Sequence, residues 1–137
     1  MIAYDMRYAP PAPIASVVVA NAVQKRRHRS APALLDTGSD ITAIPRSLAS
    51  TLQLYPIGQI RLEDVQAQTL KVLTYAVHLT VADLSIPRLE VILTGLNHVV
   101  LGRDVLNRLY VLLNGPEAVF DVRTTPLAST QAPPAPG

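Results

Sequence analysis

The 137-residue chain has no cysteine and no tryptophan, and aromatic residues make up only 4% of it. Without cysteine it can form no disulfide, no thiol nucleophile and no thiolate metal site. With so few aromatic side chains, the core has to be built from aliphatic residues. A reducing compartment is permitted by this composition, although the lack of cysteine does not require one.

Long apolar runs are also missing. Hydrophobic residues make up 49% of the sequence, yet no run approaches the ~20 residues that a membrane-spanning helix needs. The amino terminus lacks a basic segment followed by a long apolar one, so no secretory signal is predicted. We therefore expect a cytoplasmic protein with no membrane partner. The net charge is only +2, and we expect no nucleic-acid partner.

Metal and phosphate sites have no counterpart in the sequence. The three histidines, His28, His78 and His98, show no ligand spacing, and there is no phosphate-binding glycine loop. We predict no metal site and no cofactor. A basic run at residues 25–29 is interpreted as a solvated hairpin turn. Its alternatives are a site for an anionic partner or a cleavage site.

Short valine- and leucine-rich stretches bounded by Pro, Gly or Asn recur along the chain and indicate a mainly β protein. Pro45, with Leu48 and Leu52 on one face, predicts a helix over residues 46–54. The length suits one domain. We place a lead or edge strand at residues 1–12, the domain at 13–122, and a disordered tail rich in Pro and Ala at 123–137.

Asp36 stands at the end of an apolar run and is followed by Thr37, Gly38 and Ser39. An isolated carboxylate at the end of a buried strand is costly, which points to a use for it. Gly38 allows the backbone to turn sharply and to approach a ligand closely. The alternative is an aspartate that merely caps a turn.

A second motif lies at residues 99–109, where hydrophobic residues ending at Leu101 are followed by Gly102 and a short helical segment. Together the two motifs resemble the signatures of the retropepsin-like aspartic proteases. They occur in the family's order, 66 positions apart (102 − 36). With a single Asp-Thr-Gly and no internal repeat, the chain resembles the single-domain, homodimeric branch. The resemblance implies a closed acid-protease β-barrel with one or two short helices and one catalytic loop per chain.

The resemblance also implies a catalytic pair made of Asp36 from each of two identical chains. Two carboxylates within about 3 Å cannot both ionise easily, so they share one proton. One member can then take a proton from water while the other donates to the peptide carbonyl oxygen. The implied partners are a second copy of the chain and a peptide or protein substrate. A monomer should be inactive.

Roles for the neighbouring residues follow from the same resemblance. Thr37 matches a threonine whose hydroxyl bonds across the dimer axis, and Gly38 matches a residue whose backbone meets the substrate. At the position of Ser39 a hydroxyl can bond the adjacent carboxylate. Asp40 and Arg103 match a pair that ties the loop to the second motif and braces the binding groove; a bidentate contact is expected. The alternative is two unrelated surface charges.

A protease of this kind needs a flap, a hairpin that closes over the peptide. We predict its arms at residues 59–65 and 70–77 and its tip at 66–69. The tip lacks the glycine of many family members, so a loop wider than a two-residue turn is expected. The predicted substrate-binding residues are Gly38, Asp40, Asp64, Val65, Gln66, Ala67 and Gln68. Leu101 and Gly102, with Asp40 and Arg103, are predicted to be structural.

The rest of the domain is read as further strands. Residues 80–83 and 89–93 are predicted to complete the sheet around a turn near Pro87, and residues 110–113 and 118–122 to form a closing hairpin. Dimer contacts are expected from the ends of the domain. Phe120 is either an anchor of that contact or an ordinary core residue.

The sequence therefore predicts an aspartic endopeptidase that acts as a homodimer. Two alternatives stay open. One is a retropepsin-like domain that binds peptides or dimerises with little or no turnover, which the glycine-free flap tip motivates. The other is a small β module of unrelated function.

Overall fold

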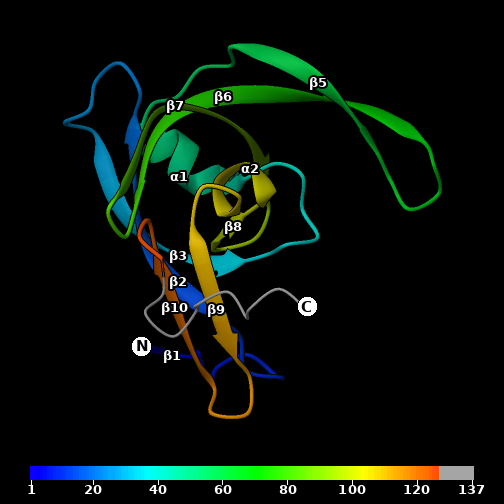
Figure 1. Ribbon diagram of the computed structural model, residues 1–137. Helices are drawn as coiled ribbons and strands as arrows, with labels where there is room; N and C mark the ends of the chain where they lie inside the picture. The colour runs from blue at the N-terminus through cyan, green and yellow to red at the C-terminus, as the bar shows by residue number, and fades with distance from the viewer. Residues whose placement is uncertain (127–137) are drawn as a thin grey trace, which may run out of the picture.

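The computed structural model describes residues 1–126, and most of its regular structure is β (Figure 1). The two helices are short, α1 (Arg46–Thr51) and α2 (Arg103–Leu106). The strands are β1 (Ile2–Ala3), β2 (Ile14–Asn21), β3 (His28–Leu35), β4 (Ala43–Pro45), β5 (Gly58–Glu63), β6 (Thr69–Val81), β7 (Leu84–Thr94), β8 (Val99–Leu101), β9 (Tyr110–Asn114) and β10 (Val119–Arg123). Of the predicted tail, residues 127–137 lie outside the described part.

Six strands close into a barrel, which confirms the predicted fold class. Hydrogen-bonded neighbours run in the order β2-β3-β8-β4-β7-β6, and β6 pairs back with β2 to complete the ring. The pairs β3–β8 and β4–β7 are parallel and the others are antiparallel. Closure leaves the strands of the ring without free edges. β5 stays outside the ring, and among residues 1–126 it pairs only with β6.

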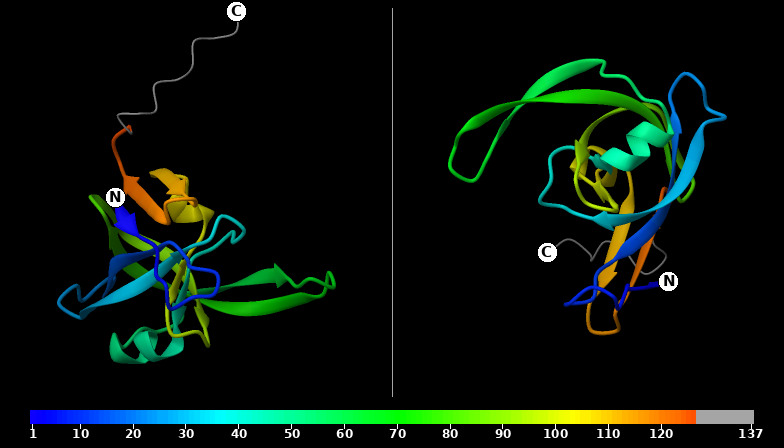
Figure 2. Two further views of the ribbon diagram at one scale, coloured as in Figure 1. Left: turned by 90° about the horizontal axis from the view of Figure 1, so that it is seen from below. Right: turned by 180° about the vertical axis from the view of Figure 1, so that it is seen from behind.

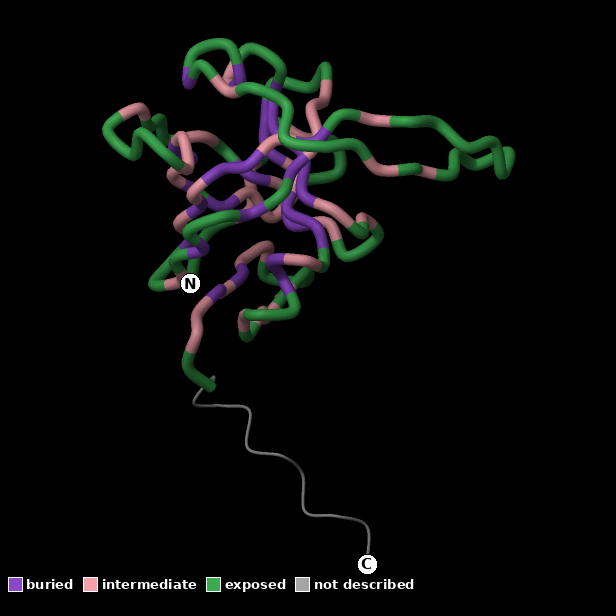
Figure 3. The backbone as a smooth tube through the Cα atoms, turned by 90° about the horizontal axis from the view of Figure 1, so that it is seen from above, coloured by how far each residue is buried: buried purple, intermediate pink, exposed green. Residues whose placement is uncertain are grey.

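Aliphatic side chains fill the barrel, as the shortage of aromatic residues requires. In β2 the burial alternates, so that Val17 and Val19 face the core and Ser16 faces solvent. Figure 3 shows the buried residues gathered in the barrel. Phe120 is fully buried and lies against the ring of Tyr4, with the centroids 6.0 Å apart. Of the two roles considered for Phe120, core packing is the one found in the single chain.

Helix α1 is shorter than the predicted span of 46–54. It begins directly after Pro45, whose φ of −58° suits this position. Gln53 has a φ of 54° in the left-handed region, and its N–H donates to the carbonyl of Ser50. This left-handed residue turns the chain away, so the helix ends early. Neither helix of the described chain is long and apolar enough to cross a membrane.

The turn predicted near Pro87 is wrong. The chain turns at residues 82–83, where Ala82 has a φ of 50°, and Pro87 lies inside β7. The register between β6 and β7 shifts at this point, so that His78 of β6 lies opposite both Pro87 and Arg88. Such a bulge tolerates proline, because the residue need not donate to the ladder there.

A second sheet, in the order β1-β10-β9, lies at one end of the barrel. The predicted closing hairpin is present as β9 and β10, and the lead contributes β1, in which Ile2 pairs with Phe120. Further along the lead, Asp5 bonds the backbone of Ala12. The side chain of Arg7 donates to the Asp5 carboxylate and lowers its pKa to about 2.

The hairpin of β5 and the first half of β6 projects from the barrel as an exposed arm, hereafter the β5–β6 arm (Figures 2 and 3). It occupies the place predicted for the flap. Its tip spans residues 64–68, between the strand ends at Glu63 and Thr69, and is wider than a two-residue turn, as the missing glycine predicts. The Asp64 carboxylate accepts hydrogen bonds from the N–H groups of Gln66 and Gln68.

Candidate active site

Asp36 is presented by the end of β3. Residues 33–35 of that strand pair in parallel with β8, and the N–H of Asp36 continues the pairing by donating to the carbonyl of Leu101 at 3.0 Å. Leu35 and Leu101 are buried, whereas Asp36 is half-buried. The two sequence motifs therefore meet side by side, and the carboxylate stands where the buried strand reaches the surface.

The Asp36 loop, residues 36–40, folds around its own carboxylate. The N–H of Gly38 donates to Asp36 Oδ1 at 2.9 Å, and the N–H of Ser39 donates to the Asp36 carbonyl at 3.2 Å. No group among residues 1–126 donates to Asp36 Oδ2. Thr37 and Gly38 are exposed. One carboxylate oxygen is thus fixed by the loop, and the other is left for a ligand.

A buried polar network supports the loop from behind. Thr42 is fully buried; its N–H and Oγ1 donate to the carboxylate of Asp104 at 3.0 and 2.7 Å. The same Oγ1 accepts from the N–H of Gly102 at 3.1 Å. Neither Thr42 nor Asp104 was singled out from the sequence. The only sequence feature that could have indicated this network is the acidic residue Asp104 in the first turn of α2. Its partner, Thr42, lies 62 positions earlier in the chain.

Gly102 fits here because it has no side chain. A Cβ at this position would lie 2.9 Å from the backbone carbon of Ile41 and 3.0 Å from the carbonyl oxygen of Ser39. The N–H of Arg103 donates to that same Ser39 carbonyl at 2.8 Å. The second motif therefore touches the Asp36 loop through main-chain atoms.

Asp40 and Arg103 form an ion pair, in which one guanidinium nitrogen binds Asp40 Oδ1. The other terminal nitrogen donates to the carbonyl of Thr37 at 2.6 Å. The contact is therefore shared between a carboxylate and a backbone carbonyl, not bidentate to Asp40 as expected. The side chains of Arg103 and Asp40 are 43% and 81% exposed, so solvent screens the pair strongly.

We expect Asp40→Asn to lower the free energy of unfolding by less than about 1 kcal/mol, because exposed ion pairs contribute little. Arg103→Ala should cost more, since it also removes the donor to the Thr37 carbonyl. Urea unfolding of both variants beside the wild type measures the difference. A larger loss for Asp40→Asn than for Arg103→Ala would show that the charge pair, and not the backbone contact, secures the loop.

Ser39 and Thr37 flank Gly38 in the Asp36 loop, and only the contact of Ser39 can be judged in the single chain. The Ser39 hydroxyl donates to the carbonyl of Ile41 at 2.8 Å and not to a carboxylate, because the loop turns it inward. The Thr37 hydroxyl makes no hydrogen bond within residues 1–126, and its bond across a dimer axis stays a prediction.

The predicted flap residues lie apart from the loop in the single chain. Asp64, Val65, Gln66, Ala67 and Gln68 form the tip of the β5–β6 arm, and Val65 is fully exposed. No hydrogen bond within the described chain joins this tip to the Asp36 loop. Figure 1 shows the arm and the loop projecting on the same side of the barrel. Their roles in substrate binding stay predictions.

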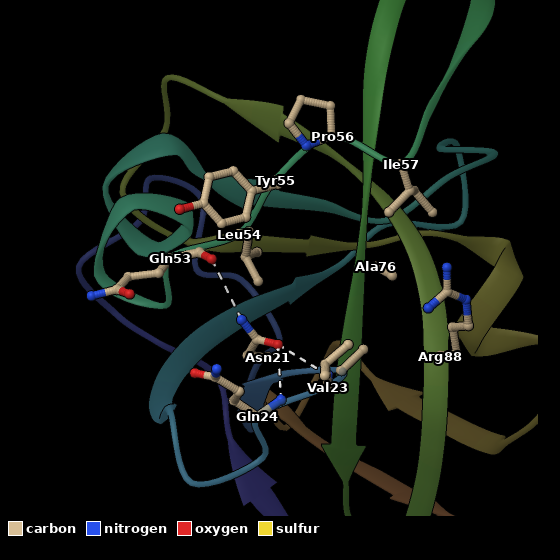
Figure 4. A pocket seen from close by; sticks show the side chains of 11 residues that line it. Asn21, Val23, Gln24, Gln53, Leu54, Tyr55, Pro56, Ile57, Ala76 and Arg88 are labelled. Carbon is tan, nitrogen blue, oxygen red and sulfur yellow. Dashed lines mark hydrogen bonds between the residues drawn. The ribbon is translucent and has the colours of Figure 1, made fainter.

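A surface pocket of about 430 Å³ lies elsewhere, at the base of the arm (Figure 4). Its walls include Asn21, Tyr55 and Arg88, and the side-chain amide of Asn21 donates to the carbonyl of Leu52 at 3.0 Å. None of the Asp36 loop residues lines it. We place the candidate site at the loop, because the carboxylate chemistry is there and not in this pocket.

A comparison with known protein families matches both motifs to a single family. Residues 23–108, more than half of the chain, match the family described as "gag-polyprotein putative aspartyl protease". The chain belongs to this aspartyl protease family. The match includes both the Asp36 loop and Gly102. The two motifs that carry the resemblance to the retropepsin-like proteases therefore lie within the matched region. The curated proteins offer no match to the chain.

Solved structures show the same fold. The Simian Foamy Virus (mac) protease is 14% identical, with 69% of this chain and 91% of that chain covered and a TM-score of 0.52. The EIAV protease complexed with the inhibitor HBY-793 is 18% identical, with 70% and 86% covered and a TM-score of 0.50. A foamy viral protease-reverse transcriptase in complex with an RNA/DNA hybrid is also 18% identical. The similarity covers 70% of this chain but only 12% of that protein's length, with a TM-score of 0.50.

Proposed function

We propose that the chain is an aspartic endopeptidase whose reaction centre forms when two copies bring their Asp36 carboxylates together. The observation that supports this proposal most directly is the burial and hydrogen bonding of the Asp36 carboxylate. It is half-buried at the end of a buried strand, with Oδ1 fixed by Gly38 and Oδ2 without a donor among the described residues. The chain supplies one such loop, so the second carboxylate has to come from another copy.

The chemistry follows from one proton shared by two carboxylates. The ionised Asp36 removes a proton from a water molecule, whose oxygen attacks the peptide carbonyl carbon. The protonated Asp36 gives its proton to the carbonyl oxygen, and a tetrahedral diol forms. The diol collapses as its C–N bond breaks: the leaving nitrogen takes the proton of the carboxylic acid, while one diol hydroxyl gives its proton to the other, ionised Asp36 and becomes the carbonyl oxygen of the product. Both products leave and the shared proton is restored.

The substrate class is an extended peptide with apolar side chains beside the cleaved bond. The backbone of Gly38 is exposed next to the carboxylate, where an extended chain can approach closely. The β5–β6 arm presents exposed apolar side chains, Val65, Leu70 and Leu73, which are 104%, 59% and 50% exposed. An arm that closes over a peptide would bury such surface and exclude water from the reaction.

A second candidate is a domain that binds peptides or dimerises with little or no turnover. The observation that favours it is at the arm's tip, where Ala67 holds a φ of 61° that glycine adopts more easily. A tip held in this conformation would reorganise less readily around a substrate. This candidate keeps the Asp36 loop but not the reaction.

The test is cleavage of an unstructured protein substrate between about pH 3 and 8, at several enzyme concentrations. We expect the highest activity at mildly acidic pH, where the pair holds one proton, and inhibition by a statine-type transition-state mimic. Below the dissociation constant of the dimer, the rate should rise faster than linearly with enzyme concentration. Sedimentation that shows a dimer, together with no cleavage at any pH, would favour the second candidate.

A further inference from the structure

We propose that the surface pocket at the base of the β5–β6 arm binds an acidic peptide segment, with an apolar side chain in the pocket and a carboxylate on Arg88. The pocket has a volume of about 430 Å³, and residues of one chain form all of its described lining. The proposal therefore depends neither on the pairing of two copies nor on cleavage at Asp36. It assigns a second recognition site, separate from the Asp36 loop.

The pocket is preformed, because Asn21 ties two of its walls together. The side-chain amide of Asn21 donates to the carbonyl of Leu52 at 3.0 Å, at the end of α1. Its Oδ1 accepts hydrogen bonds from the N–H groups of Val23 and Gln24, both at 3.0 Å, and so shapes the β2–β3 turn (Figure 4). Walls that are already in place reduce the ordering that a ligand has to impose when it binds.

Apolar side chains from three separate segments gather around the pocket. Val23, Tyr55 and Ile57 line it and are 84%, 80% and 46% exposed. Leu54 and Ala76 add further apolar surface. The segments are the β2–β3 turn, the connection between α1 and β5, and β6. Exposed apolar residues that are gathered in this way mark a site of interaction, and covering them with an apolar side chain favours binding.

The polar part of the pocket is positively charged. Arg88 is the one charged residue among the described residues that line it. Its guanidinium takes part in no ion pair within residues 1–126. The other charged residue of β7, Glu90, accepts a hydrogen bond from the Thr74 hydroxyl at 2.9 Å and does not line the pocket. Arg88 is therefore open to a ligand carboxylate, which it can hold with two parallel N–H···O bonds.

The basic run at residues 25–29 extends this positive charge beyond the pocket. It directly follows Gln24, which lines the pocket. Lys25 and Arg26 are exposed and take part in no ion pair within the described chain. No Asp or Glu occurs between residues 6 and 35. Several carboxylates of one ligand can therefore meet positive charge here, and this complementarity selects an acidic partner.

A peptide matches these features better than a nucleic acid does. The net charge of the chain is only +2, so there is no broad positive field for a phosphate backbone. The pocket combines a single cation with an apolar wall. An apolar side chain next to an acidic one has the same two properties at the same spacing, whereas a phosphate backbone supplies only the charge.

The test is the binding of a fluorescein-labelled acidic peptide, Asp-Glu-Leu-Asp-Glu, to the Asp36→Asn chain, measured by fluorescence anisotropy. The amide peptide Asn-Gln-Leu-Asn-Gln carries the same label and has the same shape without the side-chain charges. It should bind at least about tenfold more weakly. Binding of the acidic peptide should persist at protein concentrations where sedimentation shows a monomer, because one chain forms the pocket. Neither measurement requires cleavage.

Two substitutions separate the charge from the apolar wall. Arg88→Gln should raise the dissociation constant of the acidic peptide about tenfold or more and leave that of the amide peptide unchanged. Val23→Ser should raise both about threefold, because it removes apolar surface that the leucine covers. Arg108→Gln is the matched control, since Arg108 is exposed and does not line the pocket. Losing that positive charge should leave binding unchanged, and circular dichroism establishes that each variant is folded.

Four results would overturn the proposal. One is equal affinity for the acidic and the amide peptides. Another is an equal effect of Arg88→Gln and Arg108→Gln, which would mean that only the net charge matters. The third is a single-stranded oligonucleotide that binds more tightly than the acidic peptide with an affinity that Val23→Ser does not change.

The fourth is binding that disappears when the protein is diluted to a monomer. That result would move the peptide to the paired Asp36 loops, and so reject the pocket and keep the proposed function. Binding to the monomer that is sensitive to Arg88→Gln, together with a wild-type chain that cleaves nothing, would support the pocket and reject the proposed function.

Discussion

Asp36→Asn should abolish peptide cleavage and leave the fold intact. Asparagine has the same shape, and its carbonyl oxygen can still accept the hydrogen bond from the N–H of Gly38. It can neither take a proton from water nor return one to the substrate. Because positioned acids and bases contribute about 10²–10⁴-fold each, turnover should fall by at least that factor.

The comparison needs a matched aspartate outside the site. Asp83, on the β6–β7 turn, binds Thr124, and this hydrogen bond lowers the pKa of its carboxyl. Asp83→Asn should cleave the same substrate at the wild-type rate. Mixing equal amounts of wild-type and Asp36→Asn chains should leave roughly a quarter of the wild-type activity, because random pairing makes only that share of intact pairs. An Asp36→Asn variant within tenfold of wild type would refute the assignment.

Gly102→Ala should lower the free energy of unfolding by about 1–3 kcal/mol, the usual cost of forcing extra atoms into a packed region. The added methyl would meet backbone atoms of Ile41 and Ser39 at 2.9 and 3.0 Å, and backbone cannot swing aside as a flexible side chain can. The displaced segment carries the Asp36 loop, so cleavage should fall as well. Urea unfolding and the cleavage assay measure the two effects.

Gly95→Ala is the matched control. A Cβ at Gly95 would meet nothing within 4 Å, and the φ of this residue is not positive. The free energy of unfolding should stay unchanged or rise by up to about 1 kcal/mol, because alanine restricts the unfolded chain. If both variants lost the same free energy of unfolding, the close approach of backbone atoms at Gly102 would not be the cause of the loss.

The features predicted correctly from the sequence are local ones. The strand before Asp36, the glycine turn after it, and the Leu101-Gly102 motif are each written within a few consecutive residues. So is the closing hairpin of β9 and β10. The fold class followed from these elements and from the resemblance that the two motifs carry.

The features missed depend on contacts between distant residues or on unusual backbone geometry. Asp104 and Thr42 lie 62 positions apart, and their bond is visible only once the barrel brings them together. Pro87 was taken for a turn because proline interrupts regular strands, whereas a bulge accommodates it. Helix α1 ends early because Gln53 turns left-handed, a position where glycine would have been the signal.

Two of the four hydrogen bonds between the Asp36 loop and the second motif join main-chain atoms alone, and the other two come from the Arg103 side chain. Asp36 donates to the carbonyl of Leu101, Arg103 donates to the carbonyl of Ser39, and Gly102 approaches the same carbonyl. A hydrogen bond of this kind is indifferent to which side chains the two residues carry. Mutations that spare Arg103, Thr42 and Asp104 can therefore accumulate around the loop without breaking the two main-chain contacts, provided that position 102 stays free of a side chain. Chains that share only 14–18% of their residues with this one can for that reason have the same architecture.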